Sequence, residues 1–201
     1  EGTIVKVIKN KDDQVRIVDS VPDFIDNKVY YPIPEICPSC TQVLLTMPNA
    51  EVKCANQECP EKTMVRLRHF RDSMGLNTIS DDMLLYMYDN KIVVNPEDLF
   101  DPKLAMKLES WNEGYISANH VAIILKQIEN HRNTTVSKVI YALGIEGVRE
   151  TTSKLVARYF PNIKSFLLLE TANLSHIPGL TRGAADSIRH FLNESKNQPI
   201  A

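Results

Sequence analysis

The stretch that organises this sequence begins with Cys37-Pro38-Ser39-Cys40 and ends with Cys54-Ala55-Asn56-Gln57-Glu58-Cys59. All four cysteines of the chain lie in it, and thirteen residues separate the two pairs. Two cysteine pairs on short turns, joined by a loop of this length, place four sulfurs around one tetrahedral ion. Zn²⁺ suits four thiolates, and because no ligand position stays open we expect a structural site. The alternatives are two disulfides in a secreted protein, or buried thiols without a metal.

The overall composition is that of a folded protein, with 43% hydrophobic and 24% charged residues and a net charge of -2. This charge excludes a simple basic protein that coats DNA, so any binding to phosphate must come from local patches or from backbone N–H groups. No apolar run approaches the roughly 18 residues that span a bilayer, and we expect no signal peptide. We therefore expect a protein of the cytoplasm, in a bacterium or in the host cell of a virus, that is not secreted and has no membrane partner.

Residues 1–31 are rich in β-branched side chains, with two strand-like runs at 2–8 and 14–18 separated by a polar turn. Two strands are marginal alone, so we expect them to be the end of a larger sheet. The chain begins in the first of these runs and not with methionine, which predicts a piece of a longer protein. A short hairpin is expected between the cysteine pairs, within residues 32–62.

From Lys62 onward the pattern is helical, because Met64, Leu67 and Phe70 recur at helical spacing. The basic residues between them either form a solvated face or contact phosphate; they are Lys62, Arg66, Arg68 and Arg71. A second helix is expected over Asp81–Asn90, capped by Ser80 or Asp81.

A turn followed by a helix with small residues recurs along the rest of the chain, at 114–118, 144–148 and 179–185, with a weaker copy at 78–80. The spacing predicts repeated helix–hairpin–helix units. Glycine permits a positive φ in such a turn and lets N–H groups approach a phosphate, while the next helix directs its N-terminus at the same anion. Each copy alone would fit a glycine-broken hairpin in a helical bundle, but four copies behind a zinc module favour DNA binding.

Taken together, these motifs resemble the C-terminal half of NAD-dependent DNA ligases, nearly from end to end. The cysteine spacing and Tyr141-Ala142-Leu143-Gly144-Ile145 are the specific parts, and Gly2-Thr3-Ile4-Val5-Lys6-Val7 is similar to the closing strands of that family's OB-fold. The resemblance implies a mainly α, multi-domain fold: the end of an OB-fold at 1–31, a four-cysteine zinc finger at 32–62, and an all-α helix–hairpin–helix domain with four repeats at 63–198.

The resemblance also implies a function. The segment would be a monomeric grip on nicked double-stranded DNA, with structural zinc on Cys37, Cys40, Cys54 and Cys59. NAD and the adenylated lysine would lie in an upstream adenylation domain of the same polypeptide. The chain contains no Lys-x-Asp-Gly motif, so we expect no catalytic residue in it and no activity from it alone.

The hairpins depart from the family's Gly–hydrophobic–Gly pattern, and a glycine that commonly follows the first cysteine pair is Thr41 here. Arg149 and Thr181 stand at two hairpin positions where glycine is expected, and with Arg182 they offer side-chain donors instead. The expected DNA-binding residues are Thr78, Ser80, Gly114, Gly144, Gly147, Arg149, Gly179, Thr181 and Arg182.

Two other functions remain open from the sequence. The first is a DNA-junction or repair-scaffold module with no enzyme attached. The second is a protein-interaction module whose contact aromatics are Trp111, Phe160 and Phe166, although their helical spacing favours a place in the core.

Overall fold

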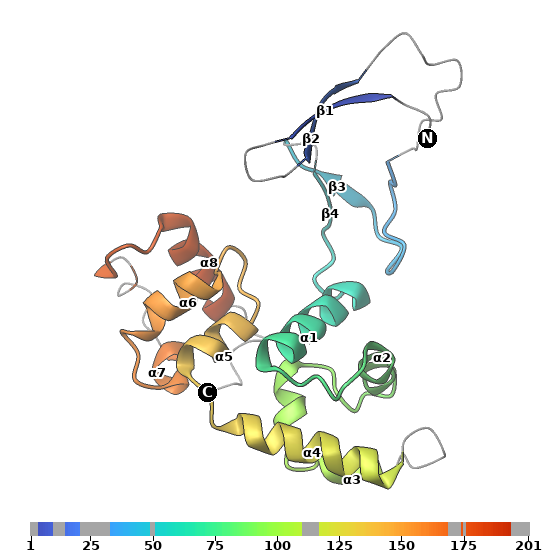
Figure 1. Cartoon of the computed structure of the whole chain (residues 1–201), viewed down its shortest axis with the longest axis vertical. Helices are drawn as coiled ribbons and strands as arrows, with labels where there is room; N and C mark the ends of the chain where they lie inside the picture. The colour runs from blue at the N-terminus through green and yellow to red at the C-terminus, as the bar shows by residue number, and fades with distance from the viewer. Residues whose placement is uncertain are drawn as a thin grey trace. The chain divides into compact units, whose positions relative to one another are not determined.

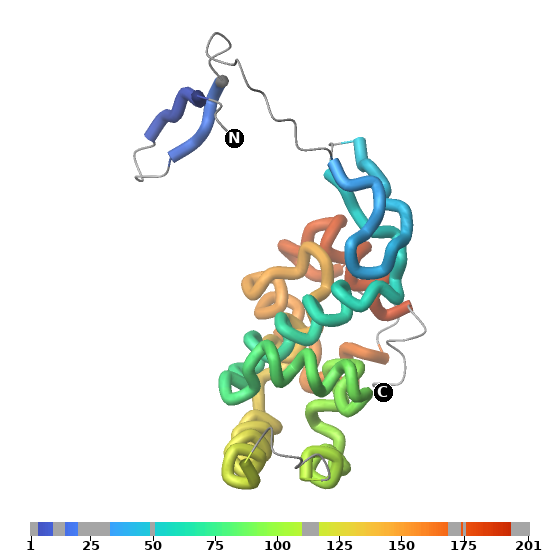
Figure 2. The backbone as a smooth tube through the Cα atoms, turned by 90° about the vertical axis from the view of Figure 1, so that its right-hand side faces the viewer, coloured from blue at the N-terminus to red at the C-terminus, as the bar shows by residue number. Residues whose placement is uncertain are grey.

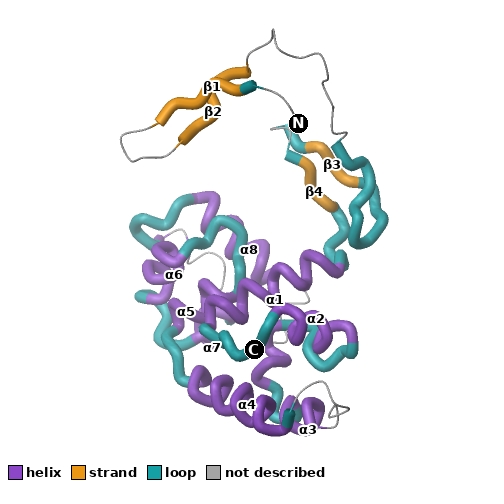
Figure 3. The backbone as a smooth tube through the Cα atoms, turned by 45° about the vertical axis from the view of Figure 1, so that its right-hand side comes forward, coloured by secondary structure: helices purple, strands orange, loops and turns teal. Residues whose placement is uncertain are grey.

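A computed structural model describes residues 4–9, 15–20, 33–48, 51–109, 117–168, 174 and 176–193 of the chain. The chain divides into two compact units, Glu1–Ala55 and Asn56–Ala201. The described strands lie in the first unit and the described helices in the second (Figures 1 and 3). The prediction of a mainly helical chain with a few short strands is confirmed, while the number of hairpin repeats stays a prediction.

The first unit contains an antiparallel pair of strands, β1 (Val5–Lys9) and β2 (Val15–Ser20). Their register shifts between Lys6 and Val7, as at a β-bulge. The apolar side chains of this pair are largely exposed, for example Val7 at 54% and Ile17 at 69%. The two predicted strands are confirmed, and the rest of the predicted β segment, including 21–31, lies outside the described residues.

A second, shorter hairpin joins β3 (Leu44–Thr46) to β4 (Val52–Cys54). Leu44 pairs with Cys54, and an isolated bridge between Ile36 and Val43 extends the pairing toward the first cysteine pair. The predicted hairpin between the cysteines is therefore present, and its backbone pairing brings the start and the end of the cysteine-rich stretch together.

The second unit is helical. Its elements are α1 (Pro60–Met74), α2 (Asp81–Asp89), the 3₁₀ helix η2 (Pro96–Phe100), α3 (Leu104–Glu109), α4 (Ala118–Arg132), α5 (Val136–Ala142), α6 (Glu150–Ala157), α7 (Ile163–Leu167) and α8 (Arg182–Asn193). Side-chain oxygens cap several of the described helices. For example, Ser80 accepts from Met83 N–H at α2, Ser117 from His120 N–H at α4, and Thr135 from Lys138 N–H at α5. The helix predicted over 81–90, with its Ser80 cap, is confirmed.

Two apolar cores hold this unit together. The first lies among α1 to α4 and includes Leu67, Leu84 and Leu99, all fully buried. The second lies among α5 to α8 and contains Phe166, which is also fully buried. Helix α5 packs against α1 and contributes Ala142 to the first core, which joins the two halves.

The arrangement of the helical unit can be followed in two views. In Figures 1 and 2, α3 and α4 lie side by side at the end of this unit that is farther from α8. Among the described helices of the chain, none has the length and apolar character that a membrane span requires.

Candidate metal centre and nucleic-acid interface

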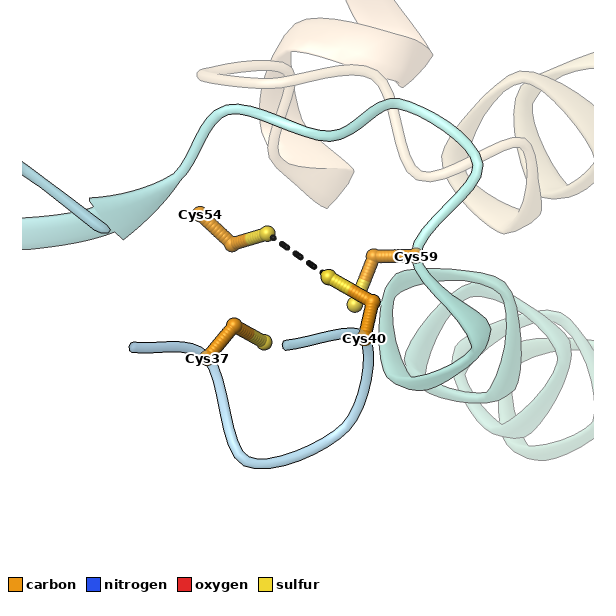
Figure 4. A group of neighbouring side chains, drawn as sticks. All are labelled: Cys37, Cys40, Cys54 and Cys59. Carbon is orange, nitrogen blue, oxygen red and sulfur yellow. Dashed lines mark hydrogen bonds between the residues drawn. The ribbon is translucent and has the colours of Figure 1, made fainter. Parts of the chain in front are cut away.

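The four cysteines converge on one point (Figure 4). Their four sulfur atoms all lie within 4.8 Å of one another, and the Sγ atoms of Cys40 and Cys54 are 3.5 Å apart. A tetrahedral zinc ion with Zn–S bonds of about 2.3 Å separates its sulfur ligands by about 3.8 Å. The cluster therefore has the size of a zinc site with four thiolate ligands, and none of its cysteines is joined in a disulfide.

The first pair of sulfurs is positioned by a tight turn that the Ile36–Val43 bridge closes. Thr41 N–H donates to Cys37 O at 2.9 Å, and Cys37 N–H donates to Gln42 O at 2.8 Å. Thr41 closes this turn with φ of +59°, in the left-handed region. Its Oγ1 also donates to the carbonyl of Cys40. Thr41 thus takes a backbone conformation that favours glycine.

The second pair is fixed by β4 and by the start of α1. Cys54 ends β4, and Cys59 is the N-cap residue of α1. Asn56 shapes the turn between them, since its side chain accepts from Glu58 N–H and its carbonyl accepts from Cys59 N–H. Cys59 thus stands at the positive end of the α1 helix dipole.

Burial and ligand chemistry both fit a structural metal site. Cys37 and Cys59 are 6% and 1% exposed, while Cys40 and Cys54 are partly exposed. The cluster consists of sulfur atoms alone, which favours zinc over hard cations such as Mg²⁺ or Ca²⁺. With four protein ligands, no position is left for water or substrate, so the chemistry is that of a cross-link.

The turn between α5 and α6 has the features expected of a phosphate-binding hairpin. Gly144 and Gly147 have φ of +68° and +73°, and both are exposed. The apolar residues that alternate with them, Leu143, Ile145 and Val148, are buried in the second core. The core thus anchors the turn while its glycines remain accessible.

Arg149 stands at the N-cap of α6 in this same turn. Its side chain is exposed and makes no hydrogen bond or ion pair with the described residues, while its carbonyl accepts the hydroxyl of Ser153 at 3.1 Å. A guanidinium at a helix N-terminus adds positive charge where backbone N–H groups already favour an anion.

The turn before α8 is similar in part. Gly179 has φ of +84°, and Thr181 Oγ1 accepts from Ala184 N–H as a helix cap. Arg182 follows with a side chain that is 97% exposed and only 3.9 Å from the carboxylate of Asp186. The first turn of α8 contains no acidic residue.

The α5–α6 and α8 hairpins lie next to each other. The side chain of Ser187 in α8 comes within 4.0 Å of the point where a Cβ on Gly147 would stand. A cavity of about 520 Å³ lies here, and Gly144, Glu146, Asp186 and His190 contribute to its wall. Lys62 and Arg66 of α1 also line it.

The turn between α1 and α2 differs, because its polar groups have partners inside the protein. Thr78 donates both its N–H and its hydroxyl to Gln127 Oε1, and Ser80 Oγ caps α2. Gly114, expected in the second hairpin, lies outside the described residues, as does Trp111. Of the other two aromatic residues, Phe166 is fully buried and Phe160 packs edge-on against its ring at 5.8 Å.

Two of the four basic residues of α1, Arg68 and Arg71, form ion pairs. Arg71 bonds to Asp72 and Asp81, and Arg68 reaches Glu61 at 3.0 Å. Burial alone would lower the pKa of Arg71, but the hydrogen bonds to its two aspartates outweigh that effect and raise it. Arg68 and Arg71 therefore stabilise the fold through ion pairs within the chain. Lys62 and Arg66 line the hairpin cavity.

The partners of Thr78 could not be foreseen from the sequence. Gln127 lies 49 residues away on α4, and nothing in the sequence marks it as a partner of a turn. The same holds for His69, whose ring bonds to the carbonyl of Tyr141 across 72 residues.

Comparison with known proteins agrees with this picture. Residues 138–200 match the helix-hairpin-helix motif family. A DNA ligase of Brachyspira hyodysenteriae is 32% identical over 96% of this chain and 27% of its own length. Those of Bdellovibrio bacteriovorus and Aquifex aeolicus are 30% and 29% identical over 90% and 83% of this chain.

The chain spans about a quarter of the length of these curated relatives, with shares of 27%, 28% and 23%. A four-cysteine cluster of the size of a zinc site and a helix–hairpin–helix motif accompany the matches. The resemblance to DNA ligases that the motifs predict is therefore confirmed over most of this chain.

Proposed function

We propose that this chain is the DNA-binding portion of an NAD-dependent DNA ligase. It grips duplex DNA around a nick while an adenylation domain elsewhere in the same polypeptide joins the 5′-phosphate to the 3′-hydroxyl. The observation that carries the proposal is the α5–α6 turn, where two exposed glycines with positive φ and the exposed Arg149 meet at a helix N-terminus. Its support from outside the chain is that the similar proteins are named DNA ligases.

The grip works through phosphates and not through bases. At the α5–α6 turn, Gly144 and Gly147 let backbone N–H groups approach a phosphate closely, and Arg149 adds a charged donor. At the next hairpin, Thr181 and Arg182 present side-chain donors at the N-terminus of the twelve-residue helix α8. Such contacts carry no sequence information, which suits an enzyme that must act at any nick.

Zinc has a purely structural part in this proposal. The thiolates of Cys37, Cys40, Cys54 and Cys59 hold the ion, which supplies the cross-link that so short a module needs for a stable fold. We also propose the domain limits 1–31, 32–62 and 63–198, with the first as the end of an OB-fold. NAD and the adenylated lysine belong to the upstream domain, so the segment alone is inactive in ligation.

The test is fluorescence anisotropy of the purified chain with nicked, intact and single-stranded DNA at several salt concentrations. We expect binding to duplex whose logarithm falls linearly with the logarithm of salt concentration. Arg149→Gln should weaken binding. It should also lower the magnitude of this salt slope by about one, the change expected when one phosphate contact is lost. Arg158→Gln is the matched control, because Arg158 lies exposed at the other end of α6.

The outcomes separate the proposal from a protein-interaction module. Equal effects of the two arginine variants would remove Arg149 from the interface. An absence of binding to any of the three DNA forms at low salt would contradict the proposal as a whole and favour a protein-interaction module.

A further inference from the structure

We propose that the first hairpin of this chain, residues 75–80, is closed to DNA because Gln127 occupies its anion position. The inference rests on the proposed function, since it states which hairpins form the interface. The hairpin then fixes the packing of α4 against α1 and α2. DNA is bound by the α5–α6 and α8 hairpins.

The first observation is the set of hydrogen bonds around Thr78. Its N–H donates to Gln127 Oε1 at 3.0 Å, and its hydroxyl donates to the same oxygen. Gln127 Oε1 thus accepts hydrogen bonds from both the N–H and the hydroxyl of Thr78, the two donors that a phosphate oxygen would use here. His120 Nε2 donates to the carbonyl of Thr78 at 3.3 Å, so all three polar groups of this residue have partners on α4.

His120 and Gln127 are seven residues apart, which is about two helical turns, so they project from the same face of α4. The two side chains therefore hydrogen-bond to the turn from two positions along α4. Thr78 and Gln127 are both partly buried. A buried donor that loses its hydrogen-bond partner costs about 1–3 kcal/mol, so the arrangement stabilises the packing of α4.

The backbone of Ile79 in this turn is also satisfied within the chain. Ile79 N–H donates to Leu76 O at 3.1 Å, and Ile79 O accepts from the guanidinium of Arg71 at 3.2 Å. The first turn of α2 contributes the carboxylates of Asp81 and Asp82. Asp81 is paired with Arg71, so the charge of Asp82 is the one that stands at the helix end where a phosphate would have to approach, and it repels the phosphate.

The α8 hairpin shows the contrast, since its helix has no acidic residue in the first turn. At the α5–α6 hairpin Arg149 faces solvent, and the one acidic residue of the first turn, Glu150, bonds to Lys154 at 2.6 Å. The same motif thus has two environments in one chain, one closed by a side chain and one open.

Three variants that each lower the net charge by one test the inference: Gln127→Glu, Arg149→Gln and Arg158→Gln. A carboxylate at position 127 still accepts both donors of Thr78, so the packing of α4 is kept while negative charge is added to the first hairpin. We expect Gln127→Glu to bind a nicked duplex within about twofold of Arg158→Gln, because their long-range charge effects are equal. Arg149→Gln should bind more weakly than both, with a salt slope lower by about one.

A tenfold weakening by Gln127→Glu, or a salt slope that falls as in Arg149→Gln, would overturn the inference by placing DNA at the first hairpin. If neither the unchanged chain nor any of the three variants binds DNA, the proposed function is wrong. Closure of the hairpin is then decided by the next measurement alone.

Amide hydrogen exchange at Thr78 reads the hydrogen bond directly. We expect this amide to be protected without DNA, to gain no protection when the nicked duplex is added, and to exchange faster in Gln127→Leu, which has no acceptor. A Thr78 amide that exchanges like an exposed one, or that slows when DNA is added, contradicts the closed hairpin.

Discussion

His69 Nε2 lies 2.9 Å from the carbonyl oxygen of Tyr141, and their rings pack edge to face with centroids 5.0 Å apart. The same carbonyl accepts the N–H of Gly144 at 3.1 Å. One oxygen at the end of α5 therefore links α1 to the turn that carries the proposed phosphate site. The orientation of this turn therefore depends on a residue of α1, outside the turn itself.

Replacing His69 by Phe keeps a ring against Tyr141 but removes the donor. We expect a loss of about 1 kcal/mol in the free energy of unfolding, the usual net value of one hydrogen bond. DNA affinity should fall several-fold as the α5–α6 turn loosens. His69→Gln, which can donate to the same carbonyl, should restore both quantities in part, and equal losses in the two variants would speak against the hydrogen bond.

Gly147→Ala separates backbone strain from crowding. A Cβ at this position meets only Ser187 Oγ at 4.0 Å, so there is room for it, but φ of +73° is unfavourable for alanine. We expect a loss of about 1–2 kcal/mol in chemical denaturation and weaker binding to duplex. Gly183→Ala, in α8 with an ordinary φ and open space, is the control and should stabilise the fold by about 0.5–1 kcal/mol.

Thr41→Gly should strengthen the metal module. Thr41 has φ of +59°, and a β-branched residue in this region costs about 1–2 kcal/mol relative to glycine. The variant should therefore keep its zinc up to a higher chelator concentration than the unchanged chain does. Lys91, the other described non-glycine residue with positive φ (+58°), provides the comparison. Lys91→Gly should leave zinc retention unchanged, because Lys91 lies after α2.

Glu97 should make stability depend on pH. Burial raises the pKa of Glu97 above its ordinary value of 4.5, and the neighbouring charge of Asp98 adds to this effect. The folded chain thus holds this proton more tightly than the unfolded chain, so stability falls as pH rises from the unfolded pKa through the folded one. We expect Glu97→Gln to raise the melting temperature at pH 7 and to raise it less near pH 4. A constant difference across this range would contradict the raised pKa.

Much of the fold was predictable from local pattern. The cysteine spacing predicts the cluster, and the helical spacing of Met64, Leu67 and Phe70 predicts α1, because these signals act over a few residues. The Ser80 cap is equally local. These elements follow from propensity and burial without knowledge of distant partners.

What escaped prediction depends on contacts across long separations in sequence. Sequence marks Thr78 as a candidate phosphate donor, yet the structure binds its donors to Gln127 of α4. The four basic residues of α1 look alike in sequence, but Arg71 turns out to be 11% exposed and held by two aspartates. Whether a donor or a charge is available is decided by packing, which no periodic pattern encodes.

Removal of the metal is the most direct check of the cysteine cluster. Zinc binding to small modules contributes on the order of 10 kcal/mol, more than a stretch with two three-residue strands can gain from its own packing. A strong chelator should therefore unfold residues 33–59. The far-ultraviolet circular dichroism spectrum should keep most of its helical signal, because the helices pack around two cores of their own.

The extent of this unfolding is measured by amide exchange with and without chelator, together with the zinc content by native mass spectrometry. We expect one zinc per chain, and protection that is lost between Cys37 and Cys59 and regained when zinc is returned. Cys40→Ser should lose zinc at much lower chelator concentration, since one of the four thiolates is gone. Unchanged exchange in the metal-free chain would show that the four cysteines are held together by packing alone, and the zinc assignment would then be wrong.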